Sequence, residues 1–216
     1  MVGNKMRRTR VKICGITRRE DIETCVEYGV DALGFVFVES SPRCVSPETA
    51  AELIVNVPPF IQTVGLFMAQ SREFVSSVLH TVPLNLLQFH GNESPAECEM
   101  HNMDYIKAIP MGGGVEPTEY ASQYPRSKGF LLDSNAFGES GGSGGIFDWS
   151  RIPDNLGKPL ILAGGLNAEN VASAITQVRP YAVDVSSGVE AAKGIKDRDK
   201  IAAFMKGVKQ GDNRTN

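Results

Sequence analysis

A regular alternation of short apolar runs with amphipathic stretches most strongly constrains the fold of this chain. The apolar runs have the length of buried strands, and the stretches between them have the length of helices that cover a sheet. Two helix starts are marked by a capping serine before a first-turn proline, at Ser46-Pro47 and Ser94-Pro95. The expected strands are 11–14, 32–36, 62–67, 84–89, 105–109, 129–132, 160–163 and 182–185, and the expected helices are 19–28, 47–56, 71–81, 94–101, 117–123, a short one after 148, 168–178 and 197–207.

This pattern amounts to eight βα units of roughly 25 residues, close to the lower size limit of an eight-stranded barrel. An open doubly wound sheet would have about five or six strands and a glycine phosphate fingerprint at its first turn, which Cys14-Gly15-Ile16-Thr17 is not. The predicted fold class is therefore α/β, a single (β/α)8 TIM barrel. We expect a disordered lead-in over 1–10, a catalytic barrel domain over 11–206 and a frayed polar tail over 207–216.

Composition excludes several classes of protein. The net charge of −3 argues against a nucleic-acid partner, which would require a basic face. No run of about 20 apolar residues is present to span a membrane. The four cysteines have neither C-x-x-C spacing nor paired histidines nearby, so we expect neither a zinc site nor a disulfide framework. Reduced thiols then indicate a cytoplasmic protein.

Two strand ends offer chemically useful side chains to the same mouth of the predicted barrel. Cys14 ends the first strand and Asp133 ends the sixth, and barrel enzymes place their chemistry at the carboxyl ends of strands. Each residue also has a plain structural interpretation, because unpaired cysteines are commonly buried and an aspartate can cap a helix. Together at one mouth they suggest a pair of groups for proton transfer.

The seventh and eighth strands end in glycine and serine, at Gly164-Gly165 and Ser186-Ser187-Gly188. Such ends suit a phosphate that is bound by backbone N–H groups and a helix N-terminus. The alternative is that Gly164-Gly165 merely turns the chain into the next helix. The glycine- and serine-rich loop 138–145 follows Asp133, and we interpret it as a lid over a substrate rather than a flexible linker.

Two further side chains belong to the same mouth. Arg43 follows the second strand, and a solvated or salt-bridged arginine is as consistent with the sequence as a two-pronged clamp for a carboxylate. His90 ends the fourth strand. On its own, a histidine at such a position is more often structural than catalytic.

Seven groups of residues form an ordered set of motifs along the chain: Val-Lys-Ile-Cys-Gly-Ile-Thr at 11–17, Gly-Phe-Val-Phe at 34–37 with Ser-Pro-Arg at 41–43, Gln-Phe-His-Gly at 88–91, Leu-Asp at 132–133, Gly-Gly-Ser-Gly at 141–144 with Phe-Asp-Trp at 147–149, Leu-Ala-Gly-Gly-Leu at 162–166, and Val-Asp-Val-Ser-Ser-Gly-Val-Glu at 183–190. This set resembles phosphoribosylanthranilate isomerase over about residues 11–206. It departs from the usual pattern at Phe89, where leucine is common, at 65–68, where Gly-Leu-Phe-Met varies a usual Gly-Val-Phe-Val, and in lacking a proline before Gly194. None of these changes touches Cys14 or Asp133.

The resemblance implies an enzyme of tryptophan biosynthesis that needs no metal or cofactor and acts on a small phosphorylated substrate. It would convert N-(5-phosphoribosyl)anthranilate to 1-(2-carboxyphenylamino)-1-deoxyribulose 5-phosphate by an Amadori rearrangement. Asp133 would be the general acid that protonates the furanose oxygen, and Cys14 the general base that removes the C2′ proton. Asp133 must then be protonated when substrate binds, whereas Cys14 must be partly thiolate despite an ordinary thiol pKa of about 8.5.

The resemblance also implies roles in binding. Arg43 would anchor the anthranilate carboxylate, Asp184 would hydrogen-bond the sugar or the bridging amine, and His90 would contact the substrate. The positions that map to the phosphate-binding loops are Gly142, Gly164, Gly165, Ser186, Ser187 and Gly188.

Rival proteins on the same barrel fit the strand ends less well. Indole-glycerol-phosphate synthase would require a lysine acid at a strand end, and a bifunctional histidine/tryptophan isomerase would have aspartate in place of Cys14. A non-catalytic phosphate-metabolite-binding barrel is the alternative from another class, but it should have lost Cys14 or Asp133. The sequence leaves monomer and homodimer both open.

Overall fold

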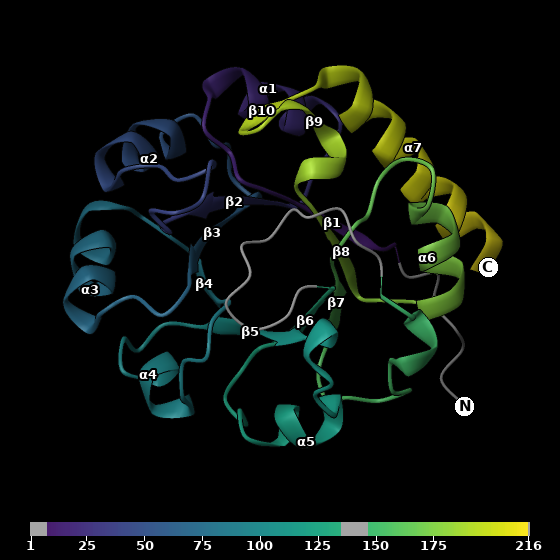
Figure 1. The fold of residues 1–216 in the computed structure, drawn as a ribbon. Coiled ribbons are helices and arrows are strands. Elements are labelled where there is room, and N and C mark those ends of the chain that lie inside the picture. Colours follow the sequence, from purple (N-terminus) through teal and green to yellow (C-terminus); the bar gives the residue numbers. More distant parts are fainter. Residues whose placement is uncertain (1–7, 135–146, 216) are drawn as a thin grey trace.

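The computed structural model describes residues 8–134 and 147–215. Within these residues, eight parallel strands pair in chain order and close into a barrel, with helices around the outside (Figure 1). The predicted α/β barrel is confirmed. Its strands are β1 (Arg10–Cys14), β2 (Ala32–Val36), β3 (Gln62–Phe67), β4 (Leu86–Phe89), β5 (Tyr105–Pro110), β6 (Phe130–Asp133), β7 (Leu160–Leu162) and β8 (Ala182–Val185).

The helices that cover the barrel begin where the sequence marks their starts. The side chain of Ser46 accepts a hydrogen bond from Thr49 N, and Ser94 forms a full capping box with Glu97. The α-helices are α1 (Arg19–Glu27), α2 (Pro47–Ile54), α3 (Arg72–Thr81), α4 (Pro95–Glu99), α5 (Pro117–Ser122), α6 (Val171–Val178) and α7 (Arg198–Thr215), and the short 3-10 turns are η1 (Met111–Gly113), η2 (Trp149–Arg151) and η3 (Ser187–Val189).

Strand β1 illustrates how side-chain alternation divides the core. Val11 and Ile13 are buried in the apolar layer between the sheet and the helices. Lys12 lies opposite Asp184 of β8 in the strand register, and its ammonium pairs with that carboxylate inside the barrel. Cys14 follows on the same face as Lys12, because successive side chains of a strand point to opposite sides. The strand therefore presents both residues to the barrel interior.

Parts of the structure differ from the sequence prediction. After β8 the chain forms a small antiparallel hairpin, β9 (Glu190–Ala192) and β10 (Ile195–Lys196), which the sequence does not predict. In addition, α6 begins at Val171 rather than 168, because the side chain of Asn167 accepts hydrogen bonds from the N–H groups of Glu169 and Asn170 in a preceding turn.

The chain from 207 onward, which the sequence predicts to fray, continues as part of α7 to Thr215. Val208 is buried, and Gly211 lies so close to α6 that a Cβ on it would be 2.8 Å from Cβ of Ile175. Asp212 accepts hydrogen bonds from the backbone N–H and hydroxyl of Thr9, at 3.1 and 2.6 Å. Packing and this link to the start of β1 keep the last turns helical. In the two described segments, no helix combines the length and apolarity needed to cross a membrane.

Candidate active site

A pocket opens at the carboxyl ends of the strands, where the sequence places the candidate residues. One wall is apolar and consists of Val36, Val38, Leu66 and Met68. The predicted site residues that line this pocket are Cys14, Arg43, His90, Asp133, Gly164, Gly165, Asp184, Ser186 and Ser187.

One predicted phosphate-binding position within the described residues, Gly188, lies next to that lining. Gly188 belongs to η3 beside the pocket, and a Cβ there would lie 1.9 Å from the carbonyl oxygen of Leu166. Glycine is thus required because the loops after β7 and β8 touch through their backbones. Gly142 and the predicted lid 138–145 lie outside the described residues.

The Cys14 thiol is buried against the backbone of β2. A Cβ on Gly34 would lie only 2.8 Å from Sγ of Cys14, so glycine at this position makes room for the thiol. Burial raises the pKa of Cys14, and the carboxylate of Asp184 raises it further. The ammonium groups of Lys12 and Lys196 act in the opposite direction and lower it. The thiolate at this position therefore depends on nearby positive charge.

Asp184 forms a buried ion pair with Lys12 in the barrel interior. Nζ of Lys12 lies 2.9 Å from Oδ2 of Asp184, and both side chains are less than 10% exposed, at 6% and 7%. The other carboxylate oxygen, Oδ1 of Asp184, is buried and has no hydrogen-bond partner among the described residues. Burial raises the pKa of Asp184, Lys12 lowers it, and the neighbouring charge of Asp133 raises it. Oδ1 of Asp184 is therefore available as a hydrogen-bond acceptor at the pocket, and the charge of Asp133 affects the pKa of Asp184.

Asp133 and His90 contact each other across the pocket. Nε2 of His90 lies 3.3 Å from Oδ2 of Asp133, and the Ser134 hydroxyl donates to Oδ1 at 3.4 Å. The amide Nε2 of Gln88 lies 3.0 Å from Nδ1 of His90. With this amide as donor, Nδ1 is the acceptor and the ring proton on Nε2 faces Asp133. Gln88 thus orients the imidazole toward the carboxyl group.

Arg43 reaches the pocket but also forms a buried ion pair of its own. Its Nε and one Nη each donate to a carboxylate oxygen of Glu190 at 2.7 Å, in a two-pronged arrangement. Although burial alone would raise the pKa of Glu190, Arg43 and Lys196 lower it. Arg43 is therefore salt-bridged within the protein and also lines the pocket, and its role as a carboxylate clamp stays a prediction.

The loop after β7 contributes two glycines, Gly164 and Gly165, to the lining of the pocket. Gly164 and Gly165 have φ of +82° and +64°, a region that side chains strongly disfavour. A Cβ on Gly164 would also lie 2.5 Å from the backbone nitrogen of Ser134. Loop β7–α6 is therefore drawn tightly against the end of β6, which places its backbone next to Asp133.

Sequence reasoning missed several polar residues that complete the site: Lys12, Gln88, Glu190 and Lys196. Lys12 had a usable signal, because it precedes Cys14 by two positions and must share its face of the strand. Gln88 precedes His90 by the same spacing. Glu190 ends the motif at 183–190 and Lys196 lies six residues further on, but no sequence pattern predicted the short hairpin that brings both to the site.

The described residues hold no group of three or more His, Cys, Asp or Glu side chains that is arranged to bind a metal ion. The fold and the pocket together define a class, that of (β/α)8-barrel proteins with acid–base side chains at the carboxyl ends of their strands.

Comparison with known proteins identifies the family. The sequence model of N-(5'-phosphoribosyl)anthranilate (PRA) isomerase matches residues 11–207. The isomerase of Nitrosococcus oceani is 52% identical over 201 residues, covering 93% of this chain and 98% of that protein. The crystal structure of the Thermus thermophilus isomerase superposes with a TM-score of 0.82 at 37% identity, over 93% of this chain and 98% of that one.

A second solved isomerase contains reduced 1-(o-carboxyphenylamino)-1-deoxyribulose 5-phosphate and has a TM-score of 0.78 at 42% identity, with 93% of this chain and 98% of that chain covered. The present chain belongs to the N-(5'-phosphoribosyl)anthranilate isomerase family, and it is an enzyme of tryptophan biosynthesis.

Proposed function

We propose that this enzyme converts N-(5'-phosphoribosyl)anthranilate to 1-(2-carboxyphenylamino)-1-deoxyribulose 5-phosphate, with Asp133 as general acid and Cys14 as general base. The observation that carries the proposal is a thiol and a carboxyl group in one pocket, between an apolar wall and glycine-rich strand ends. The apolar wall suits an aromatic ring, and the backbone N–H groups of the glycine-rich ends suit a phosphate.

Ring opening requires a proton donor at the furanose oxygen. Asp133 would give its proton to that oxygen as the C1′–O bond breaks and the amine nitrogen forms an iminium at C1′. His90 and Ser134 contact the two carboxyl oxygens of Asp133, at 3.3 and 3.4 Å, and hold the group in place. The acid is thereby fixed in position before the substrate arrives.

Isomerisation then requires a base at C2′. Cys14 would take the C2′ proton while the iminium accepts the electron pair, which yields an enolamine that tautomerises to the ketone. Burial raises the pKa of Cys14, so its thiolate is scarce in the empty pocket but is a strong base once formed. The cations Lys12 and Lys196, and the iminium of the intermediate, favour the thiolate.

The remaining pocket residues would bind and orient the substrate. Arg43 would meet the anthranilate carboxylate, and Oδ1 of Asp184 would accept a hydrogen bond from the bridging amine or the sugar. Gly164, Gly165, Ser186 and Ser187, with Gly188 and Gly142 of the neighbouring loops, would surround the phosphate. The solved relative that contains a reduced form of the product supports a pocket of this kind.

The test is to mix the purified protein with freshly prepared phosphoribosylanthranilate, follow the fluorescence of the substrate, and identify the product by mass and chromatography. We expect the wild-type protein to turn over the substrate. Cys14→Ala and Asp133→Asn should have rates near background. A folded wild-type protein that binds the substrate without consuming it would instead indicate a non-catalytic phosphate-metabolite-binding barrel.

A further inference from the structure

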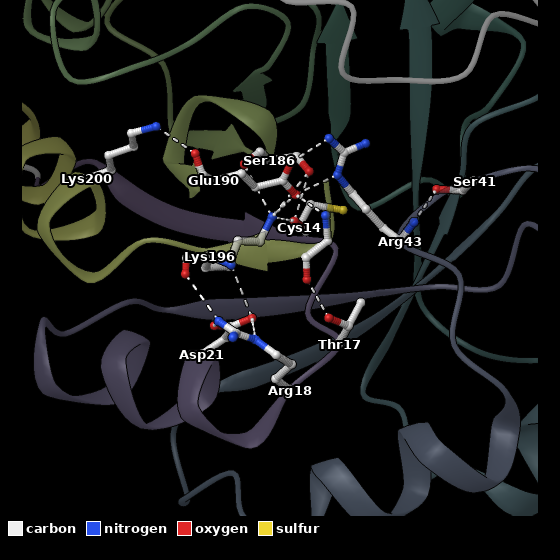
Figure 2. Close-up of polar contacts among 11 residues, drawn as sticks. Cys14, Thr17, Arg18, Asp21, Ser41, Arg43, Ser186, Glu190, Lys196 and Lys200 are labelled. Atoms are coloured by element: carbon white, nitrogen blue, oxygen red, sulfur yellow. Dashed lines mark hydrogen bonds and ion pairs between the residues drawn. The ribbon is translucent and has the colours of Figure 1, made fainter. Parts of the chain in front are cut away.

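A cluster of charged side chains extends from the pocket to the hairpin behind it, and one member, Glu190, has no part in the reaction as described so far. It consists of Arg43, Glu190 and Lys196, which we call the Glu190 cluster (Figure 2). The three residues are 6%, 7% and 5% exposed. Two cations around one carboxylate leave an excess of positive charge next to Cys14, where a thiolate must form.

Glu190 connects the two cations of the cluster. It accepts the two-pronged hydrogen bonds of Arg43 at 2.7 Å, and Oε1 also lies 2.9 Å from Nζ of Lys196. A guanidinium held along its Nε edge has a fixed plane, so the direction in which its other donors point is also fixed. Glu190 therefore fixes the orientation of the Arg43 guanidinium at the pocket.

Lys196 connects the cluster to the thiol-bearing strand. Its ammonium donates to the carbonyl oxygen of Cys14 at 2.6 Å and to that of Ser186 at 3.2 Å (Figure 2). It thus joins the ends of β1 and β8 at the point where Cys14 and the serine loop enter the pocket. Burial lowers the pKa of Lys196, whereas Glu190 raises it. The carboxylate therefore helps the ammonium to keep its charge.

The hairpin that carries Glu190 and Lys196 is itself held on both sides. Arg18 of the loop before α1 donates to the carbonyl of Lys196 at 3.2 Å, and Lys200 of α7 donates to that of Glu190 at 2.7 Å. Thr17 donates to the carbonyl of Gly194 in the turn of the hairpin. These contacts secure the backbone of the cluster independently of its charged groups.

We propose that Glu190 and Lys196 are positioning residues of the isomerase site: Glu190 orients Arg43 for the substrate carboxylate, and Lys196 holds the backbone of Cys14 while bringing positive charge to its thiol. The inference rests on the proposed function. A merely stabilising role explains the cluster poorly, because buried ion pairs contribute little net stability relative to apolar side chains of similar size.

Glu190→Gln tests the first half of the proposal. The amide keeps the shape of the side chain but turns an N–H group toward Arg43, so the guanidinium loses its fixed plane. We expect KM for phosphoribosylanthranilate to rise about tenfold or more, with a smaller change in kcat. Glu190→Asp should recover part of the loss, and Lys193→Met, an exposed change on the same hairpin, should match wild type. An unchanged or lower KM for Glu190→Gln would overturn this half.

Lys196→Met tests the second half through the pH dependence of kcat. Lys12 of β1, Asp184 of β8, Arg43 of the loop after β2 and Lys196 of β10 all interact with the charge of Cys14. Removing the Lys196 cation raises the pKa of Cys14, so the ascending limb of the profile should move to higher pH. The Ser186 hydroxyl still donates to the carbonyl of Cys14 at 3.0 Å, which favours a folded variant.

A profile of Lys196→Met that coincides with that of wild type would overturn the second half, provided that circular dichroism shows both proteins folded. If Lys196→Met does not fold, the same profile is measured on Lys196→Gln, which retains a hydrogen-bond donor but no charge. The proposed function is judged separately. An inactive wild type would defeat it, whereas an active wild type with an inactive Cys14→Ala and normal Glu190 and Lys196 variants would defeat the positioning inference alone.

Discussion

At the scale of single residues, the interior of the barrel is governed by opposite charges in close contact. The Lys12–Asp184 pair is buried beside Cys14: Lys12 lowers the pKa of Cys14 and of Asp184, and Asp184 raises the pKa of Lys12 and of Cys14. Although burial opposes its charge, the pKa of Lys12 is raised by Asp184 and by Cys14. Asp184 and Cys14 thus favour the charged form of Lys12 next to the thiol.

The buried pair makes a stability prediction. Lys12→Met leaves the Asp184 carboxylate without its counter-ion, and we expect a loss of about 3–5 kcal/mol in the free energy of unfolding. Adding Asp184→Asn removes the stranded charge and should recover much of that loss. Urea unfolding of the single and double variants provides the measurement. A double variant that is no more stable than Lys12→Met would contradict this explanation.

Gly34 makes a prediction about catalysis. A Cβ at this position would lie 2.8 Å from Sγ and 3.0 Å from Cα of Cys14, closer than side chains pack. In Gly34→Ala the thiol must therefore shift, and we expect kcat to fall about tenfold or more, because small displacements of a reacting group are costly. Steady-state kinetics measures the effect, and a near-normal thermal unfolding curve would assign it to the thiol. Wild-type kcat in a folded Gly34→Ala would show that the contact does not matter.

At the scale of secondary-structure elements, agreement with the sequence is best where periodicity and burial act together. Strands 32–36, 62–67 and 182–185 have the predicted bounds, and most of their residues are buried. The β9–β10 hairpin has too few residues for any periodic pattern. The end of α7 was missed because its glycines resemble helix breakers, yet they permit close packing on α6.

That close packing can be tested with Gly211→Val. The glycine is buried against Ile175, and a Cβ would lie 2.8 Å from that residue, so the larger side chain must push the helices apart. We expect a loss of about 1–3 kcal/mol in the free energy of unfolding, despite the better helix propensity of valine. Gln210→Val, on the exposed side of the same helix, serves as control. Equal stability of the two variants would argue against tight packing of α6 and α7.

At the scale of the whole molecule, the site is assembled from residues that are far apart in the chain. Cys14, His90 and Asp133 come from strand ends, and the barrel topology alone predicted that they would lie at one mouth. The contacts that hold the site residues in place could be seen only in the structure. Gln88 orients His90, and Glu190 pairs with Arg43, which lies 147 residues away in the sequence. Ion pairs of this kind depend on register and loop path, which no local pattern encodes.

The Glu190 cluster also makes the free energy of unfolding depend on the protonation state of Glu190. Although burial alone would raise the pKa of Glu190, Arg43 and Lys196 hold it below its ordinary value of about 4.3. The resulting stabilisation is present above about pH 4.3 and is lost as the pH falls through the lowered folded value. In urea unfolding at a series of pH values, Glu190→Gln should lose less stability on acidification than wild type. Glu52→Gln, an exposed change, should follow wild type. Parallel curves for Glu190→Gln and wild type would refute the linkage.

The most direct measurement of the division of roles between Asp133 and Cys14 uses phosphoribosylanthranilate that is deuterated at C2′. If Cys14 removes this proton, weakening the base in Cys14→Ser should make C2′–H cleavage slower and move the isotope effect on kcat toward its full primary value. If Asp133 opens the ring in an earlier step, Asp133→Asn should move the isotope effect toward unity, because ring opening then limits the rate. The opposite pair of shifts, or no shift in either variant, would contradict the assignment of acid and base.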